Sequence, residues 1–202
     1  MPDLPADVRR TLVEPRALAA LSDSVTPAGV VALCRFVDVP LASALSAGEH
    51  RLVAICADVR DPGNAGTVVR CADAAGADAV VLAGSSVDLY NPKTLRASVG
   101  SAFHLPVAVE PDAAAAVRAA QAAGYTVLAA DGAGERDLFA IDDLLAGPTA
   151  WLLGNEAWGL ADELAALADH RVSIPIHGRA ESLNLSTAAA LCLYASARAH
   201  RS

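Results

Sequence analysis

From residue 51 onward, short apolar runs alternate with longer segments in which apolar residues recur at helical spacing. A run that is apolar at nearly every position is typical of a strand buried on both faces of a parallel sheet. Runs of this kind, some stronger than others, occur at Leu52–Cys56, Ala79–Ala83, Val107–Val109, Tyr125–Ala129, Thr149–Leu153 and Arg171–Ile176. The alternation predicts an α/β fold with a mostly parallel sheet and helices on both faces.

The predicted helices begin at residues that favour helix starts. Asn91 precedes Pro92 as an N-cap precedes a first-turn proline, and Asp112 can cap the alanine-rich helix that follows it. Asn64 is placed to cap a helix over Ala65–Ala75. Further helices are expected over Ala161–Ala168 and Leu185–Ala199, with a short one near Ile141.

The last predicted helix, Leu185–Ala199, is apolar over most of its circumference. A helix of this kind is buried on more than one side. It can pack between the sheet and another helix of the same chain, or it can pack across a subunit interface. The helix alone does not decide between these two arrangements.

The segment before residue 50 does not follow the alternation. It contains a helix-like piece over Val8–Leu21 and a strand-like run over Gly29–Phe36. A segment of roughly 50 residues is too short for an independent core of ordinary stability. We therefore expect residues 1–49 to be a remnant or truncated N-terminal region with its linker, and residues 50–202 to form the main domain.

Composition and charge narrow the class of protein. The net charge of −8 argues against a general nucleic-acid coat, although it leaves room for a local basic patch. No apolar run reaches the roughly 18 residues of a membrane span, and the N-terminus has no signal-peptide pattern. The four cysteines form no C-x-x-C pair and the histidines have no ligand spacing. We expect a cytoplasmic protein with no membrane segment and no metal.

Two blocks of glycine and small polar residues follow predicted strands, which is where open α/β sheets bind ligands. In Asn64-Ala-Gly-Thr-Val-Val-Arg70, the helical period turns Arg70 away from the core-facing side. In Gly154-Asn-Glu156, the glycine would let a ligand approach the backbone, and Glu156 could accept a hydrogen bond or a proton. Taken singly, these residues are also explained by a helix cap, a surface arginine and a solvated turn.

A third block, Ser182-Leu-Asn184, precedes the apolar last helix and is followed by Ser186 and Thr187. A helix start needs a cap for its free N–H groups, but one cap does not need four short polar residues. A bound polar ligand is a reasonable use for the surplus. No G-x-G-x-x-G is present, which weakens the hypothesis of an ordinary dinucleotide-binding enzyme.

In this order and spacing, the three blocks resemble motifs one, two and three of the SpoU/TrmH family, the knotted RNA ribose methyltransferases. Ile174-Pro-Ile176 and the segment Arg96–Pro106 are also similar to family sequence, and the resemblance extends over about Arg51–Arg198. It implies an α/β fold that ends in a deep trefoil knot. It also implies S-adenosylmethionine as the cofactor, bound in the knot.

The implied reaction is methyl transfer from S-adenosylmethionine to a ribose 2′-hydroxyl of RNA, with ribosomal RNA favoured and transfer RNA as the alternative. The resemblance assigns the reaction to Arg70, Asn64, Glu156, Ser182 and Asn184. It assigns the cofactor to backbone groups around Gly154, Asn155, Ile174 and Leu183. Because a guanidinium stays protonated, we expect Arg70 to bind the adjoining phosphate and the hydroxyl rather than to act as the base.

The family resemblance also implies an RNA partner and a homodimer whose active site is completed across the subunit interface. Ser22–Val31 resembles the segment that joins an RNA-binding domain to the catalytic domain in members that act on ribosomal RNA. Most of that RNA-binding domain is missing here, so target recognition is open. A non-catalytic RNA-binding dimer that retains the fold is the remaining alternative.

Overall fold

The structure is a computed structural model that describes residues 8–22, 26–46 and 51–201. The chain forms two compact units, Met1–Phe36 and Val37–Ser202. Helix α2 (Leu41–Ser46) belongs to the second unit and buries Ala44 and Leu45 in the core on one face of its sheet.

The first unit contains helix α1 (Pro15–Leu21), which buries none of its residues. The helix predicted from Val8 starts at Pro15, because a proline favours the first turn of a helix over its interior. The strand predicted over Gly29–Phe36 is wrong. These residues are exposed and irregular, and no strand of the described chain pairs with them.

Seven strands of the second unit form one parallel sheet in the order β3-β2-β1-β6-β4-β7-β5. They are β1 (Leu52–Ala57), β2 (Ala79–Ala83), β3 (Val107–Glu110), β4 (Thr126–Ala130), β5 (Arg136–Asp137), β6 (Thr149–Leu153) and β7 (His170–Ser173). The predicted parallel α/β fold is confirmed. Strand β7 ends before the predicted Ile176, because Pro175 has no N–H to donate to a ladder. The trefoil knot stays a prediction implied by the family.

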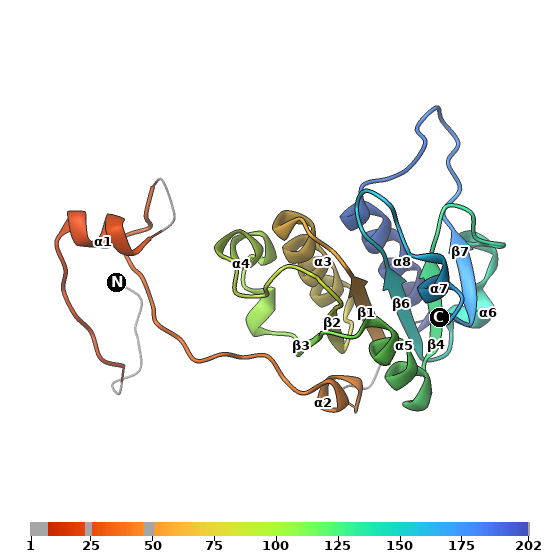
Figure 1. The fold of residues 1–202 in the computed structure, drawn as a ribbon, viewed down its shortest axis with the longest axis horizontal. Coiled ribbons are helices and arrows are strands. Elements are labelled where there is room, and N and C mark those ends of the chain that lie inside the picture. Colours follow the sequence, from red (N-terminus) through yellow and green to blue (C-terminus); the bar gives the residue numbers. More distant parts are fainter. Residues whose placement is uncertain (1–7, 23–25, 47–50, 202) are drawn as a thin grey trace. The chain divides into compact units, whose positions relative to one another are not determined.

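Helices cover both faces of this sheet (Figure 1). The helices are α3 (Pro62–Ala75), α4 (Pro92–Ser98), α5 (Ala113–Ala122), α6 (Asp142–Leu145), α7 (Asp162–Ala165) and α8 (Leu185–Ala199), with 3₁₀ turns at Ser101–Phe103 and Leu138–Ala140. Alternate residues of β1 enter two separate cores: Leu52 packs with α3 and α8, and Val53 packs with α2 and α5. The predicted caps Asn91 and Asp112 are confirmed.

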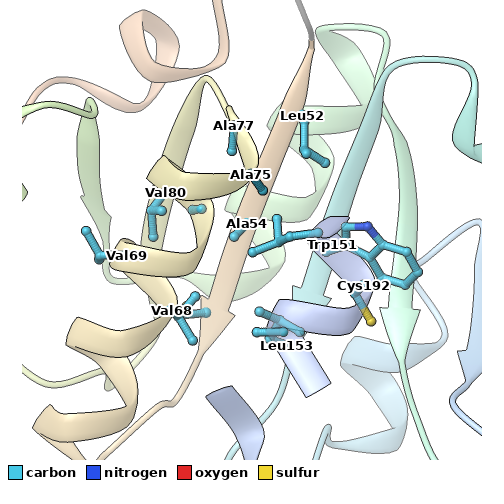
Figure 2. Close-up of a cluster of buried hydrophobic side chains, with 14 of the residues drawn as sticks. Leu52, Ala54, Val68, Val69, Ala75, Ala77, Val80, Trp151, Leu153 and Cys192 are labelled. Carbon is cyan, nitrogen blue, oxygen red and sulfur yellow. The ribbon is translucent and has the colours of Figure 1, made fainter. Parts of the chain in front are cut away.

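The last helix packs against the sheet through one of its sides. Figure 2 shows Trp151 of β6 next to Cys192 of α8 in the buried cluster. The indole N–H of Trp151 donates to Oγ of Ser196 at 2.9 Å, and both residues are fully buried. Leu191 and Tyr194, on the other side of the helix, are exposed. Packing within the chain therefore accounts for only part of this helix's apolar surface.

Helix α3 lies close to α4 because Gly66 permits it. A Cβ atom at Gly66 would lie 2.3 Å from the carbonyl oxygen of Thr94 and 2.7 Å from Cβ of Ala97. Only glycine allows the two helices this separation. Within the described residues, no helix has both the length and the apolar character needed to cross a membrane.

Candidate active site

Four loops meet at the carboxyl edge of the sheet. They follow β1, β6, β4 and β7, which are neighbours in the strand order. Because all strands are parallel, their carboxyl ends lie at the same edge, which is the ligand-binding edge of open α/β sheets. The three sequence blocks belong to the loops after β1, β6 and β7, or to the helices that begin there. The strand order therefore brings together blocks that are far apart in sequence.

A pocket of about 470 Å³ lies among the loops after β6, β4 and β7. Pockets that hold small ligands typically have volumes of about 300–1,000 Å³. All four residues predicted to bind the cofactor line it, together with two of the predicted catalytic residues: Gly154, Asn155, Ile174, Leu183, Glu156 and Ser182. Its remaining walls include apolar side chains such as Leu153 and Leu185.

A chain of hydrogen bonds links the three blocks beside this pocket. The side-chain amide of Asn64 donates to Oε1 of Glu156 at 3.3 Å. The amide of Asn184 donates to Oδ1 of Asn64 at 3.1 Å. Asn184 also caps α8, since its Oδ1 accepts the backbone N–H of Ser186 at 2.9 Å. Asn64 thus contacts both Glu156 and Asn184, so three of the predicted catalytic residues are connected through it.

The side chain of Asn64 takes part in this chain because it does not cap α3. The prediction that Asn64 is the N-cap was wrong. Asp61 is the cap, accepting the backbone N–H of Asn64 at 2.8 Å, and Pro62 occupies the first turn. An aspartate followed by proline is a strong helix start, and it moves Asn64 inside the first turn. The Asn64 amide is then free to bind Glu156.

Glu156 is held by the loop that follows β1. Its carboxylate accepts the backbone N–H of Arg60 at 3.1 Å and that of Asp61 at 3.0 Å. Partial burial by itself raises the pKa of Glu156. The backbone N–H groups of Glu156, Arg60 and Asp61, with the Asn64 amide, outweigh that effect and hold the pKa below its ordinary value. Such a carboxylate is suited to accept hydrogen bonds and poorly suited to accept a proton.

The second block is folded into a tight turn. Asn155 and Gly159 exchange two backbone hydrogen bonds of 2.8 and 2.9 Å. The Asn155 side chain donates to the carbonyl of Asp58 at 2.7 Å, which ties this turn to the loop after β1. A Cβ at Gly154 would lie 2.4 Å from the carbonyl carbon of Gly159. The turn itself therefore requires glycine at residue 154, a reason that differs from the ligand approach we predicted.

Arg70 does not join this cluster. It follows Asn64 by six residues on α3, which places it about 9 Å further along the axis and about 120° around it. Its side chain is exposed and makes no hydrogen bond or ion pair with the described part of the chain. The predicted outward direction of Arg70 is confirmed. Ser182 reaches the pocket wall, where it is exposed.

Sequence reasoning missed two acidic residues in the pocket wall, Asp131 and Glu181. Asp131 directly follows β4, and the position of functional residues at the ends of parallel strands could have indicated it. Nε of Arg171 donates to its carboxylate at 2.8 Å. Burial raises the pKa of Asp131, but the N–H of Ala133 and the Arg171 guanidinium reverse this and lower it. No group of three or more His, Cys, Asp or Glu residues that could hold a metal occurs in the described ranges.

Comparison with known proteins gives one consistent result. The SpoU rRNA methylase family model matches residues 51–194. A 23S rRNA guanosine 2′-O-methyltransferase from Bacillus subtilis is 34% identical over 95% of this chain and 74% of its own length. A 23S rRNA uridine 2′-O-methyltransferase from Streptomyces viridochromogenes is 41% identical over 68% of this chain, which spans 49% of that relative.

Solved structures agree with the sequence comparisons. An AdoMet-bound rRNA methyltransferase from Sinorhizobium meliloti has a TM-score of 0.72 at 40% identity, covering 80% of this chain and 60% of that one. A SpoU methyltransferase from Streptomyces viridochromogenes, also solved with AdoMet, has a TM-score of 0.70 at 37% identity, covering 77% and 63%.

Proposed function

The chain belongs to the SpoU rRNA methylase family, and we propose that it transfers a methyl group from S-adenosylmethionine to a ribose 2′-hydroxyl of ribosomal RNA. The hydrogen-bond chain from Glu156 through Asn64 to Asn184 carries this proposal. It connects all three motif blocks of the family beside a pocket of cofactor size. Relatives named as 23S rRNA 2′-O-methyltransferases support ribosomal RNA as the target.

The residues around the pocket fit S-adenosylmethionine. Apolar side chains such as Leu153 and Leu185 suit the faces of an adenine ring, and loop backbone offers polar groups at the strand ends. Gly154, Asn155, Ile174 and Leu183, which line the pocket, would hold the cofactor there. When bound, S-adenosylmethionine supplies the methyl group, through a sulfur–carbon bond that breaks as the carbon–oxygen bond to the ribose forms.

The protein's part in the reaction is to position a poor nucleophile and remove its proton. Arg70 binds the phosphate and hydroxyl of the target nucleotide as a cation, and the proton leaves through that phosphate or through water. Glu156, with its lowered pKa, orients Asn64 by accepting its amide N–H. Asn64 and Glu156 together orient Arg70 and the ribose, and Ser182 and Asn184 help to fix the cofactor.

In a homodimer with a shared active site, the exposed Arg70 of one subunit would complete the active site of the other. Exposed apolar residues flank α3: Val99 and Phe103 lie at the end of α4 and just after it, and Leu191 and Tyr194 lie on α8. Contiguous exposed apolar residues mark protein interfaces. Sedimentation should give a dimer at micromolar concentration. Mixing the inactive variants Arg70→Ala and Asn184→Ala should restore part of the activity if each site takes Arg70 from the other subunit.

Residues 1–49 are proposed to be a remnant of the RNA-binding region and its linker, although residues 1–7, 23–25 and 47–50 lie outside the described chain. We place the reaction in the cytoplasm, in line with the bacterial ribosomal RNA relatives. Transfer RNA is the alternative target, and the structure of one neighbour, at 29% identity, concerns the 2′-OH methylation of C/U34 on tRNA.

Two measurements test the proposed function. Calorimetric titration with S-adenosylmethionine should give saturable binding, and NAD should give none. Tritium from labelled S-adenosylmethionine should then enter ribosomal RNA, at a 2′-O-methyl nucleotide after digestion, and should not enter transfer RNA. Labelling of transfer RNA alone would show that transfer RNA, and not ribosomal RNA, is the target. Binding of S-adenosylmethionine with no transfer to either RNA would favour the non-catalytic RNA-binding dimer.

A further inference from the structure

The described residues that line the pocket include acidic side chains and no basic one. The acidic lining residues are Asp131, Glu156 and Glu181, and all other lining residues are apolar or uncharged. A cleft walled by one sign of charge concentrates ligands of the opposite sign. The pocket therefore favours a cation over a neutral molecule of the same shape.

The three carboxylates differ in what they bind. Asp131 is paired with Arg171, whose guanidinium offsets its charge. Glu156 is occupied by backbone N–H groups and by Asn64. Glu181 makes no hydrogen bond or ion pair with any described residue. Glu181 is therefore the carboxylate whose charge reaches the pocket without a cation or a donor to offset it.

We propose that Glu181 makes the pocket select the charged methyl donor over its spent product. This inference rests on the proposed function, since it concerns the same cofactor. S-adenosylmethionine carries a positively charged sulfonium, whereas S-adenosylhomocysteine has lost the methyl group and has a neutral thioether in its place. A carboxylate in the wall attracts the first more strongly than the second, and the difference is a Coulomb interaction.

A preference of the pocket for S-adenosylmethionine would help S-adenosylhomocysteine to dissociate after the transfer. In the transfer, the sulfur–carbon bond breaks, the methyl carbon bonds to the ribose oxygen, and the hydroxyl proton leaves to the phosphate or water. The sulfur keeps the bonding electron pair and loses its charge, so the attraction to Glu181 ends at that moment. Fresh donor can then displace product at a comparable concentration, and product inhibition is weakened.

Calorimetry on the full chain tests this with two ligands, S-adenosylmethionine and S-adenosylhomocysteine. The unaltered protein should bind the first more tightly. Glu181→Gln should lower the ratio of the two affinities by about threefold to tenfold, from a Coulomb interaction across a partly solvated pocket. Glu181→Asp keeps the charge and should keep most of the preference. Glu163→Gln, an equal loss of charge at an exposed residue of α7 outside the pocket, should leave the ratio unchanged.

An unchanged ratio in Glu181→Gln, or equal affinities in the unaltered protein, would overturn the assignment while leaving the proposed function intact. If Glu181→Gln does not fold, the unaltered protein decides by its salt dependence. Its preference should shrink as the ionic strength rises from about 0.01 M to about 1 M, where charges are strongly screened. A preference independent of salt would overturn the assignment. Failure to bind either ligand would overturn the proposed function, and the assignment with it.

Discussion

Replacing Glu156 by glutamine would test whether the hydrogen bonds of this site residue stabilise the folded protein. The carboxylate accepts hydrogen bonds from the backbone N–H groups of Arg60 and Asp61 and from the Asn64 amide. Glutamine has nearly the same shape, but one of its two terminal atoms is an NH₂ group that cannot accept a hydrogen bond. In Glu156→Gln, at least one backbone N–H therefore faces another donor, and the other contacts lose the charge that strengthens them.

The size of the effect follows from these contacts. A hydrogen bond to a charged group contributes roughly 1.5–3 kcal/mol and a neutral one roughly 0.5–1.5 kcal/mol. Because Glu156 is exposed to solvent on one side, screening reduces the difference. We expect the free energy of unfolding to fall by about 1–2 kcal/mol. For a protein of this size, that lowers Tm by about 2–8 °C.

Thermal unfolding followed by circular dichroism measures the fall in Tm of Glu156→Gln, and Glu163→Gln is the control.

The lowered pKa of Glu156 determines the sign of the pH dependence of this stabilisation. A carboxyl with a depressed pKa stabilises the fold fully above its ordinary value of 4.5, and that contribution is lost as the pH falls through the folded-state pKa. The difference in Tm should therefore shrink below pH 4.5. Equal Tm values at pH 7, or a difference that does not shrink in acid, would refute the reasoning.

Other substitutions test separate parts of the structure. Arg70→Ala should abolish methyl transfer to RNA and leave S-adenosylmethionine binding intact, and loss of binding would mean that Arg70 supports the pocket. Ser196→Ala leaves the buried indole N–H of Trp151 without its acceptor and should cost about 1–3 kcal/mol in urea unfolding, so an unchanged midpoint would contradict that role. Gly66→Ala places a Cβ 2.3 Å from the Thr94 carbonyl oxygen and should destabilise the fold by about 1–3 kcal/mol. Alanine favours helices over glycine, so a gain in stability would show that α4 moves away freely.

The central strands of the second unit were predictable because β1, β2, β4 and β6 are apolar at almost every position, whereas β5 consists of two polar residues and was not predicted. Leu52–Cys56 and Thr149–Leu153 are short apolar runs between helical segments, a pattern typical of strands buried on both faces, and both are fully buried strands. The same reasoning failed at Gly29–Phe36. A strand needs a neighbour to pair with its backbone, and periodicity within a segment carries no information about that neighbour.

The site was predictable in its parts but not in its connections. The helical period turned Arg70 outward, and Asn184 capped the last helix as a polar residue before an apolar run should. The bond between Asn64 and Glu156 depends on β6 lying beside β1, a strand order that local sequence does not determine. Glu181 drew no notice because an isolated acidic residue in a loop resembles any solvated residue.

During translation, the side-chain hydrogen bonds of Asn64 can form only after much of the chain that follows it has been synthesised. Its partners Glu156 and Asn184 lie 92 and 120 residues later in the chain. A ribosome therefore completes helix α3 long before it has made either partner, and contacts over such separations form late in folding. The sheet can assemble around β1 and β2 while Asn64 still faces water. Translation that stops before α8 yields a chain with most of its core and no reaction centre.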